Sequence, residues 1–195
     1  EAQVTEWIAH LTHGPATRLV ADFARTLDRG GVAVSLGRKL LQLVGPGIPD
    51  TYQGTEFLDF SLVDPDNRRF VTFSARKRCE GAPEDVAKQR MVREALCLRR
   101  ERAQLFLRGG YQAVFADGPA RRHVLAFART LGDEPQVIAL ATREPLALER
   151  DGGWRGTTVS LPEGNWTDRL SGKTFTGTVE LATLCAEQPV ALLTR

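Results

Sequence analysis

The sequence predicts an α+β chain: the C-terminal end of a (β/α)8 barrel, made of helices, a last strand and a loop, then a long helix and an antiparallel β-sandwich domain. Three observations predict it. The first 45 residues have helical periodicity, a polar and aromatic stretch without periodicity follows, and short apolar segments between turn residues fill the second half. We expect a barrel tail over residues 1–82, a connecting helix over 83–110 and the β-sandwich domain over 111–195.

The N-terminal part is expected to hold two helices. The first begins after Gly14 and Pro15, ends at the pair Gly30-Gly31, and has apolar residues at Leu19, Val20, Phe23 and Leu27. The second ends at Pro46 and has an apolar stripe formed by Ala33, Leu36, Leu40, Leu41 and Val44. Stripes this apolar need a larger surface to lie against, which favours the outer helices of a barrel.

The stretch from Pro46 to about Asp85 is rich in Gly, Pro, Asp, Asn and Arg and has no periodicity. Residues 47–52 are expected to form a short strand, and the rest an irregular loop. Loops this long in compact domains tend to be functional or disordered, and the aromatic residues argue against disorder. Active sites of β/α barrels lie on loops after the strands, so this loop is the candidate site.

A third helix is expected from Pro83 to Arg108, ended by Gly109-Gly110. Turn residues such as Asp151-Gly152-Gly153 then separate short apolar segments, the pattern of an antiparallel sandwich. The expected strands are residues 112–115, 124–128, 136–141, 157–161, 166–170, 178–181 and 190–193.

Composition excludes several classes of function. With 26 Lys and Arg against 24 Asp and Glu, the net charge of +2 is too balanced for a nucleic-acid partner. No apolar run approaches the roughly 20 residues that cross a bilayer, so no membrane partner is expected. The three cysteines lack the spacing of a metal site and fit a reducing cytoplasm, and His10 and His13 lack a third ligand. We expect no metal and no cofactor.

The candidate loop carries the groups that bind hydroxyl-rich ligands: carboxylate, carboxamide and guanidinium, with aromatic faces between them. The alternative is that Asp64 to Asn67 only form a turn and that the two arginines only pair with its carboxylates. The pattern is equally compatible with two roles for Tyr52 and Glu56: direct contact with the ligand, or buried support of the end of the barrel. The candidate substrate-binding residues are Asp50, Tyr52, Gln53, Glu56, Asp64, Asp66, Asn67, Arg68 and Arg69.

Two motifs in this loop resemble a known family. Residues 46–56 read PGIPDTYQGTE, which resembles the stretch around the eighth barrel strand in the alpha-amylase superfamily. Residues 62–69 read LVDPDNRR, and the two motifs together are similar to the maltooligosyltrehalose synthases of that superfamily. The chain departs from the family at Phe70, where proline is expected, and at Phe57-Leu58, where a Leu-Trp-like pair is expected.

The resemblance implies an enzyme that gives maltooligosaccharides a trehalose end by intramolecular transglycosylation. Retaining chemistry of this kind uses a carboxylate nucleophile and a carboxylic acid about 5 Å apart. In the superfamily these groups, and a third carboxylate, follow the fourth, fifth and seventh strands, before the motif at Pro46. We therefore expect no catalytic residue in this chain, no activity of the chain alone, and the N-terminal barrel as its partner.

Two other interpretations compete. One is the tail of an amylase-type α-glucan hydrolase, which shares the first motif but does not need the second. The other is a non-catalytic β-sandwich module that binds carbohydrate or stabilises a neighbour, with Trp154 and Trp166 as stacking platforms.

Overall fold

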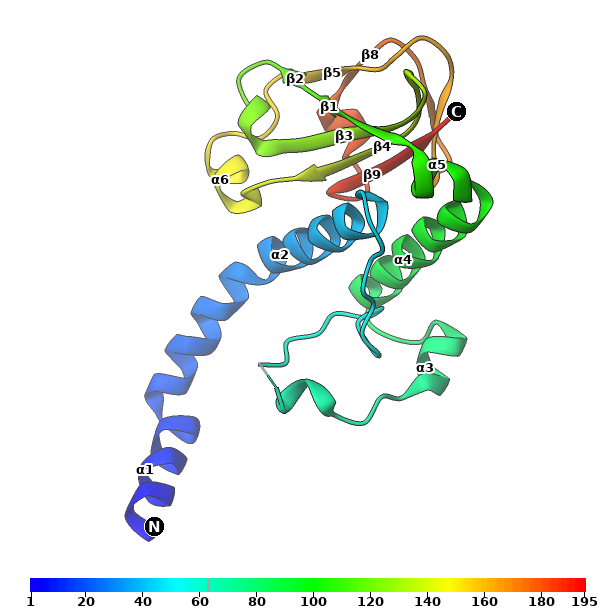
Figure 1. The fold of residues 1–195 in the computed structure, drawn as a ribbon. Helices are drawn as coiled ribbons and strands as arrows, with labels where there is room; N and C mark the ends of the chain where they lie inside the picture. Colours follow the sequence, from blue (N-terminus) through cyan, green and yellow to red (C-terminus); the bar gives the residue numbers. More distant parts are fainter. Residues whose placement is uncertain (63) are drawn as a thin grey trace.

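The computed structural model describes residues 1–62 and 64–195. Val63, which belongs to the second motif, lies outside the described residues. Figure 1 shows two sheets in the second half of the chain, with helices against one of them and a long helical arm that runs away to the N-terminus. None of the helices in the described ranges is long and apolar enough to cross a membrane.

Among the described residues, nine strands form two sheets in which every pair is antiparallel, as the sequence predicts for this half of the chain. The larger sheet has the order β1 (Gly110–Val114), β3 (Val124–Leu131), β4 (Glu134–Thr142), β9 (Val190–Thr194), β6 (Trp166–Asp168), β7 (Thr174–Phe175). The smaller sheet has the order β2 (Ala116–Asp117), β5 (Thr158–Ser160), β8 (Thr178–Glu180).

The middle strands of the larger sheet are buried on both faces, and their successive side chains point to opposite sides of the sheet. In β4, Val137 and Ala139 join a cluster with the helices, whereas Ile138 and Leu140 join a cluster with the smaller sheet. The same alternation in β9 places Leu192 in the first cluster and Leu193 in the second. The near-continuous apolar runs of these strands follow from this double burial.

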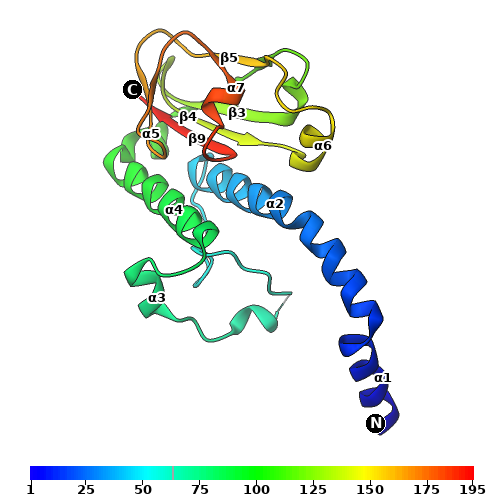
Figure 2. The same ribbon diagram turned by 180° about the vertical axis from the view of Figure 1, so that it is seen from behind.

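Two long helices, α2 (Pro15–Val44) and α4 (Pro83–Glu101), cover one face of the larger sheet. Figure 2 shows the same arrangement from behind, with α7 on the opposite side of the sheet. The other helical elements are α1 (Ala2–His13), η1 (Asp66–Arg68), α3 (Phe73–Arg78), α5 (Ala103–Arg108), η2 (Arg121–His123), α6 (Pro145–Arg150) and α7 (Leu181–Leu184).

The predicted helix end at Gly30-Gly31 is wrong, because α2 continues through both glycines. A glycine inside a helix costs only about 1 kcal/mol, which packing offsets. Gly30 is buried against Leu146 of α6, and a Cβ built on Gly30 would lie 2.8 Å from the Cγ of that leucine. This glycine therefore allows a close approach of two helices and does not end one.

Several other boundaries differ from the prediction. The expected strand at 47–52 is absent from the described structure, and its residues are bends and coil. The helix predicted from Pro83 to Arg108 is interrupted at Arg102, which lies between α4 and α5. The stretch expected to be irregular contains η1 and α3, and the short elements β7, α6 and α7 were not predicted. Such short elements have too few residues to give a periodic signal.

Within residues 1–62 and 64–195, nothing buries the side chains of α1 or those of α2 before Gly30. Every residue of α1 is at least partly exposed, and the buried residues of α2 begin only at Gly30. The exposed apolar residues of this part, here called the arm stripe, are Val4, Trp7, Ile8, Leu11, Leu19, Val20, Phe23 and Leu27. The apolar stripe predicted for the second half, from Ala33 to Val44, lies in contrast against the sheet and α4.

Candidate functional site

The candidate loop, residues 46–82, leaves the C-terminal end of α2 and returns to the N-terminal end of α4. Both views show it as an excursion away from the two sheets (Figures 1 and 2). It is held by side chains of the two helices that flank it and by pairs within the loop.

The start of the loop is held by α2 and α4 together. Arg99 of α4 donates to the carbonyl oxygens of Leu43 and Gly47, at 2.8 Å each. Gln42 of α2 donates through Nε2 to the carbonyl of Asp50 at 2.8 Å. The predicted residue Asp50 is therefore held by its backbone, and its side chain is exposed.

The middle of the loop surrounds Arg76 of α3. Its Nη2 donates to the carbonyl of Gly54 at 2.9 Å, and its guanidinium lies 4.6 Å from the centre of the Phe57 ring. The carboxylate of Glu56 lies beside it, with 3.6 Å between Oε2 and Arg76 Nε. Glu56 is about two-thirds buried, so the structure gives it contacts inside the loop, while Tyr52 and Gln53 are exposed.

The tip of the loop is an array of carboxylate–guanidinium pairs. Arg68 Nε donates to Asp64 at 2.8 Å, and Arg69 Nε donates to Asp66 at 2.8 Å. Asp66 also accepts from the backbone N–H of Leu62 at 2.7 Å, and these bonds, that from Leu62 first, lower the pKa of Asp66. The arginine–carboxylate pairing expected if these residues only form a turn is therefore present. Exposed pairs of this type contribute little to stability, so the groups remain available to a ligand.

The nine predicted residues thus fall into two groups, one from Asp50 to Glu56 and one from Asp64 to Arg69. The second group is brought together around the pairs just described. Within it, Asn67 stands apart, because its Oδ1 is buried without a hydrogen-bond partner among the described residues. Nothing in the geometry shows a sugar contact for either group, and their assignment to a substrate site stays a prediction.

Two lysines beneath the loop were missed by sequence reasoning. Lys39 of α2 lies near the loop's start, with Nζ 3.5 Å from Thr51 Oγ1, and Lys88 of α4 donates to the carbonyl of Phe57 at 2.8 Å. Burial lowers the pKa of both. A signal for Lys88 exists in the sequence: it shares helical spacing with the buried apolar residues Met91, Val92 and Ala95, where a lysine is unusual.

Among residues 1–62 and 64–195, no cluster of three or more His, Cys, Asp or Glu side chains has the arrangement of a metal site. The chemistry available in the loop is hydrogen bonding by carboxylate, amide and guanidinium groups, with Tyr52 and Phe60 exposed beside them. Such a set suits a neutral, hydroxyl-rich ligand.

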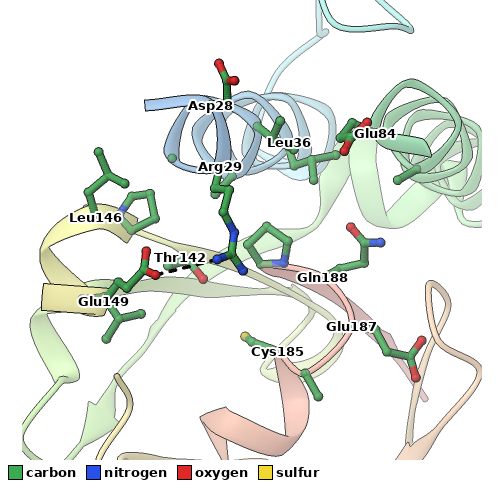
Figure 3. Close-up of a pocket in the computed structure, with 18 of the residues that line it drawn as sticks. Asp28, Arg29, Leu36, Glu84, Thr142, Leu146, Glu149, Cys185, Glu187 and Gln188 are labelled. Atoms are coloured by element: carbon green, nitrogen blue, oxygen red, sulfur yellow. Dashed lines mark ion pairs between the residues drawn. The ribbon is translucent and has the colours of Figure 1, made fainter. Parts of the chain in front are cut away.

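A pocket of about 680 Å³ lies elsewhere, between α2, α6 and the segment before β9. Figure 3 shows Arg29 reaching from α2 towards Glu149 of α6, to which its Nη1 approaches within 3.8 Å. Trp154 lines this pocket, whereas none of the nine predicted residues does. Trp166 is fully buried and donates to the carbonyl of Pro162 at 2.8 Å, so it is a core residue and no platform.

No protein-family model matches the chain. Two curated proteins of Mycobacterium tuberculosis, from strains CDC 1551 / Oshkosh and ATCC 25618 / H37Rv and both provisionally named maltooligosyl trehalose synthase, are 40% identical over all 195 residues. The chain spans about a quarter of the length of these relatives, 25%.

Solved structures also match the chain, and they too are named as synthases of this kind. The maltooligosyltrehalose synthase of Arthrobacter ramosus matches 96% of the chain with a TM-score of 0.85 and 39% identity, and the match covers 25% of that protein. A Sulfolobus tokodaii structure matches all of the chain with a TM-score of 0.72, covering 25% of that protein; at 21% identity it supports the fold alone. The resemblance stated from the two loop motifs is thereby confirmed: over its whole length the chain is similar to about a quarter of a maltooligosyltrehalose synthase.

Proposed function

We propose that this chain is the C-terminal part of an enzyme that converts the reducing end of a maltooligosaccharide into a trehalose end by intramolecular transglycosylation. The observation that carries the proposal is the 40% identity over the whole chain to relatives named for this synthase. The second loop motif favours this reaction over that of an amylase-type hydrolase. Because the chain matches a quarter of those relatives, the catalytic carboxylates belong in this proposal to the other three quarters.

In this proposal residues 1–82 are the end of the catalytic β/α barrel, residues 83–110 connect, and residues 111–195 are a β-sandwich domain. The arm stripe supports the first assignment. Its eight large apolar side chains are exposed on α1 and on α2 before Gly30, and an adjoining barrel layer would bury them. The three free cysteines suit a cytoplasmic enzyme.

The proposed reaction needs a site that keeps hold of a released sugar. The terminal glycosidic bond breaks, the remaining chain stays on the enzyme, and the freed glucose attacks through its anomeric hydroxyl after turning over. Water must not attack first. We assign to Asp66, Asn67, Arg68 and Arg69 the task of holding that glucose by hydrogen bonds, and to Asp50, Tyr52, Gln53, Glu56 and Asp64 the lining or support of the site. The exposed, paired guanidiniums support this, because pairing fixes their donors in orientation before the ligand arrives.

Substitution in the complete enzyme tests the proposal. Arg68→Ala or Asp66→Ala removes one donor or one fixing carboxylate, so free glucose should rise relative to trehalose ends, by up to about 100-fold, which is the cost of misplacing a reacting group. Chromatography of the products measures the ratio. Arg78→Ala is the matched control, because Arg78 is also an exposed arginine paired with a carboxylate, that of Glu80 at 2.8 Å. An unchanged ratio in both test variants would contradict the role assigned to the loop tip.

A second candidate function is carbohydrate binding by the chain itself, and Trp154 favours it. This half-buried indole lines a pocket that also holds polar groups of Arg29, Glu149 and Gln188. Aromatic faces with carboxylate and amide groups are typical of sugar sites. If the pocket binds α-glucan, maltooligosaccharides should quench tryptophan fluorescence of this chain, and Trp154→Ala should abolish the effect while Trp7→Ala, on the exposed arm, should leave it. Absence of quenching removes this candidate.

A further inference from the structure

Two side chains of α4 hold opposite ends of one peptide group in the candidate loop. The carbonyl of Phe57 accepts from Lys88 Nζ at 2.8 Å, and the N–H of Leu58, on the other side of the same peptide bond, donates to Asp85 Oδ1 at 2.8 Å. A single hydrogen bond fixes little more than a distance. Two bonds from one rigid helix, to opposite edges of a planar group, fix both the place and the orientation of that peptide.

Lys88 and Asp85, here called the clamp, have tightly packed surroundings. Lys88 is 5% exposed and Phe57 is 8% exposed. Gly81 lies against both partners, since a Cβ on it would meet Asp85 Cβ at 3.0 Å and Phe57 Cε2 at 3.1 Å. The clamp therefore has little room to rearrange.

Keeping an ammonium in such a place costs free energy. Burial lowers the pKa of Lys88, and so does the charge of Lys39 from α2; Asp59, Asp85 and Glu56 act in the opposite direction. An apolar residue at this position of α4 would avoid that cost. Unlike an apolar residue, Lys88 can donate a hydrogen bond to the loop, and this bond fixes the position of the loop.

The clamped peptide lies between the two groups of predicted site residues. Glu56 is the last residue of the first group and directly precedes it, and the paired tip starts at Asp64. Between them Asp59 forms a local turn in which its Oδ1 accepts from the N–H of Ser61 at 2.9 Å. When one peptide group is fixed, the short segments on either side of it are restricted in where they can lie.

We propose that Lys88 and Asp85 are positioning residues which, through the Phe57–Leu58 peptide, set where the loop tip stands and so how often the released glucose is recaptured. This inference rests on the proposed function. Without either bond the loop samples more positions, the glucose is held less often in the reacting orientation, and water competes more successfully.

The test uses the complete enzyme with four variants. Lys88→Met keeps the length of the side chain without the ammonium, and Asp85→Ala removes the acceptor. Asp85→Asn is the conservative variant, because the amide oxygen still accepts from the N–H of Leu58. Lys77→Met is the matched control, since Lys77 is an exposed lysine on α3.

Three readouts are measured: the ratio of free glucose to trehalose ends, kcat and KM for trehalose ends, and amide hydrogen exchange of the peptide covering residues 53–62. Lys88→Met and Asp85→Ala should each raise the ratio about tenfold and speed exchange of this peptide, with kcat for trehalose ends lowered more than KM rises. Asp85→Asn and Lys77→Met should behave as the unsubstituted enzyme.

A merely structural role would reduce the amount of folded enzyme and both products together, with the ratio unchanged, and that result overturns the proposal. Unchanged exchange in both disruptive variants also overturns it. If the unsubstituted enzyme forms no trehalose ends, the proposed function fails instead, while exchange still decides whether the clamp holds the loop. Should Lys88→Met not fold, Asp85→Ala alone carries both readouts.

Discussion

Arg129 of β3 is buried, and its guanidinium caps the C-terminal ends of two helices. Its guanidinium donates to the carbonyls of Val44 at 3.2 Å and Gly45 at 3.1 Å, at the end of α2. It also donates to those of Leu105 and Gly109, both at 3.1 Å, at the end of α5. The last carbonyls of a helix lack partners within it and carry partial negative charge. Although burial lowers the pKa of Arg129, a guanidinium stays protonated at neutral pH.

Replacing Arg129 by Met should lower the free energy of unfolding of the 195-residue chain by about 3 kcal/mol, because several buried carbonyls lose their donors. Arg129→Lys should recover only part of this loss, since an ammonium cannot span two helix ends. Urea unfolding followed by circular dichroism measures both. Arg121→Met, at an exposed arginine of η2, is the control; a loss at Arg129 no larger than at Arg121 would refute this account.

Among the elements, α2 contains two neighbouring glycines with different packing roles. Gly30 faces α6, with Leu146 in its way, whereas a Cβ on Gly31 would find nothing within 4 Å. Both positions gain helix propensity from alanine, but only one has space for it.

Gly31→Ala should therefore stabilise the chain by about 1 kcal/mol. Gly30→Ala should be at least about 1 kcal/mol less stable than Gly31→Ala, because Leu146 must move to admit the methyl group. Thermal or urea unfolding of the two variants side by side measures the difference. Equal stabilisation by both substitutions would mean that α2 and α6 do not approach as closely as described.

The elements also differ in how far sequence predicts them. The middle strands, β3, β4 and β9, lie where their apolar runs indicated, because burial on both faces leaves a strong local signal. The helix end predicted at Gly30-Gly31 was wrong because whether a glycine ends a helix depends on what packs against it. At 47–52 the pattern predicted a strand, but the described structure offers no neighbouring strand to pair with.

The same limit applies to the candidate site, where the sequence indicates the residue types but not their distant contacts. The residue types of the loop were apparent from its two motifs, and the pairs of Asp64 with Arg68 and Asp66 with Arg69 are close in sequence. Lys88 stands out as a lysine on the apolar face of α4, but its partner, a carbonyl 31 residues away, is not indicated by the local sequence.

At the scale of the molecule, the second half and the two long helices form one packed body, to which the loop is attached. Arg169, beside β6, joins α4 to the sheets by donating to Glu101 at 2.7 Å and to Glu94 at 3.2 Å. These bonds raise the pKa of Arg169 and lower that of Glu101. The helices that flank the loop are thus fixed to the sheets, and the loop takes its position from them.

The unbroken course of α2 constrains the length of the chain. One residue added between Leu27 and Leu36 would turn the arm stripe by about 100° relative to the residues that pack on the sheet. If an adjoining barrel layer buries the arm stripe, as proposed, the stripe would then face away from that layer while the rest of α2 stays packed on the sheet. Insertions and deletions here are tolerable only in steps that restore the angle, such as seven residues for nearly two turns. Point substitutions at the exposed positions of this segment face no such restriction, whereas Gly30 and Leu36 are held by their contacts.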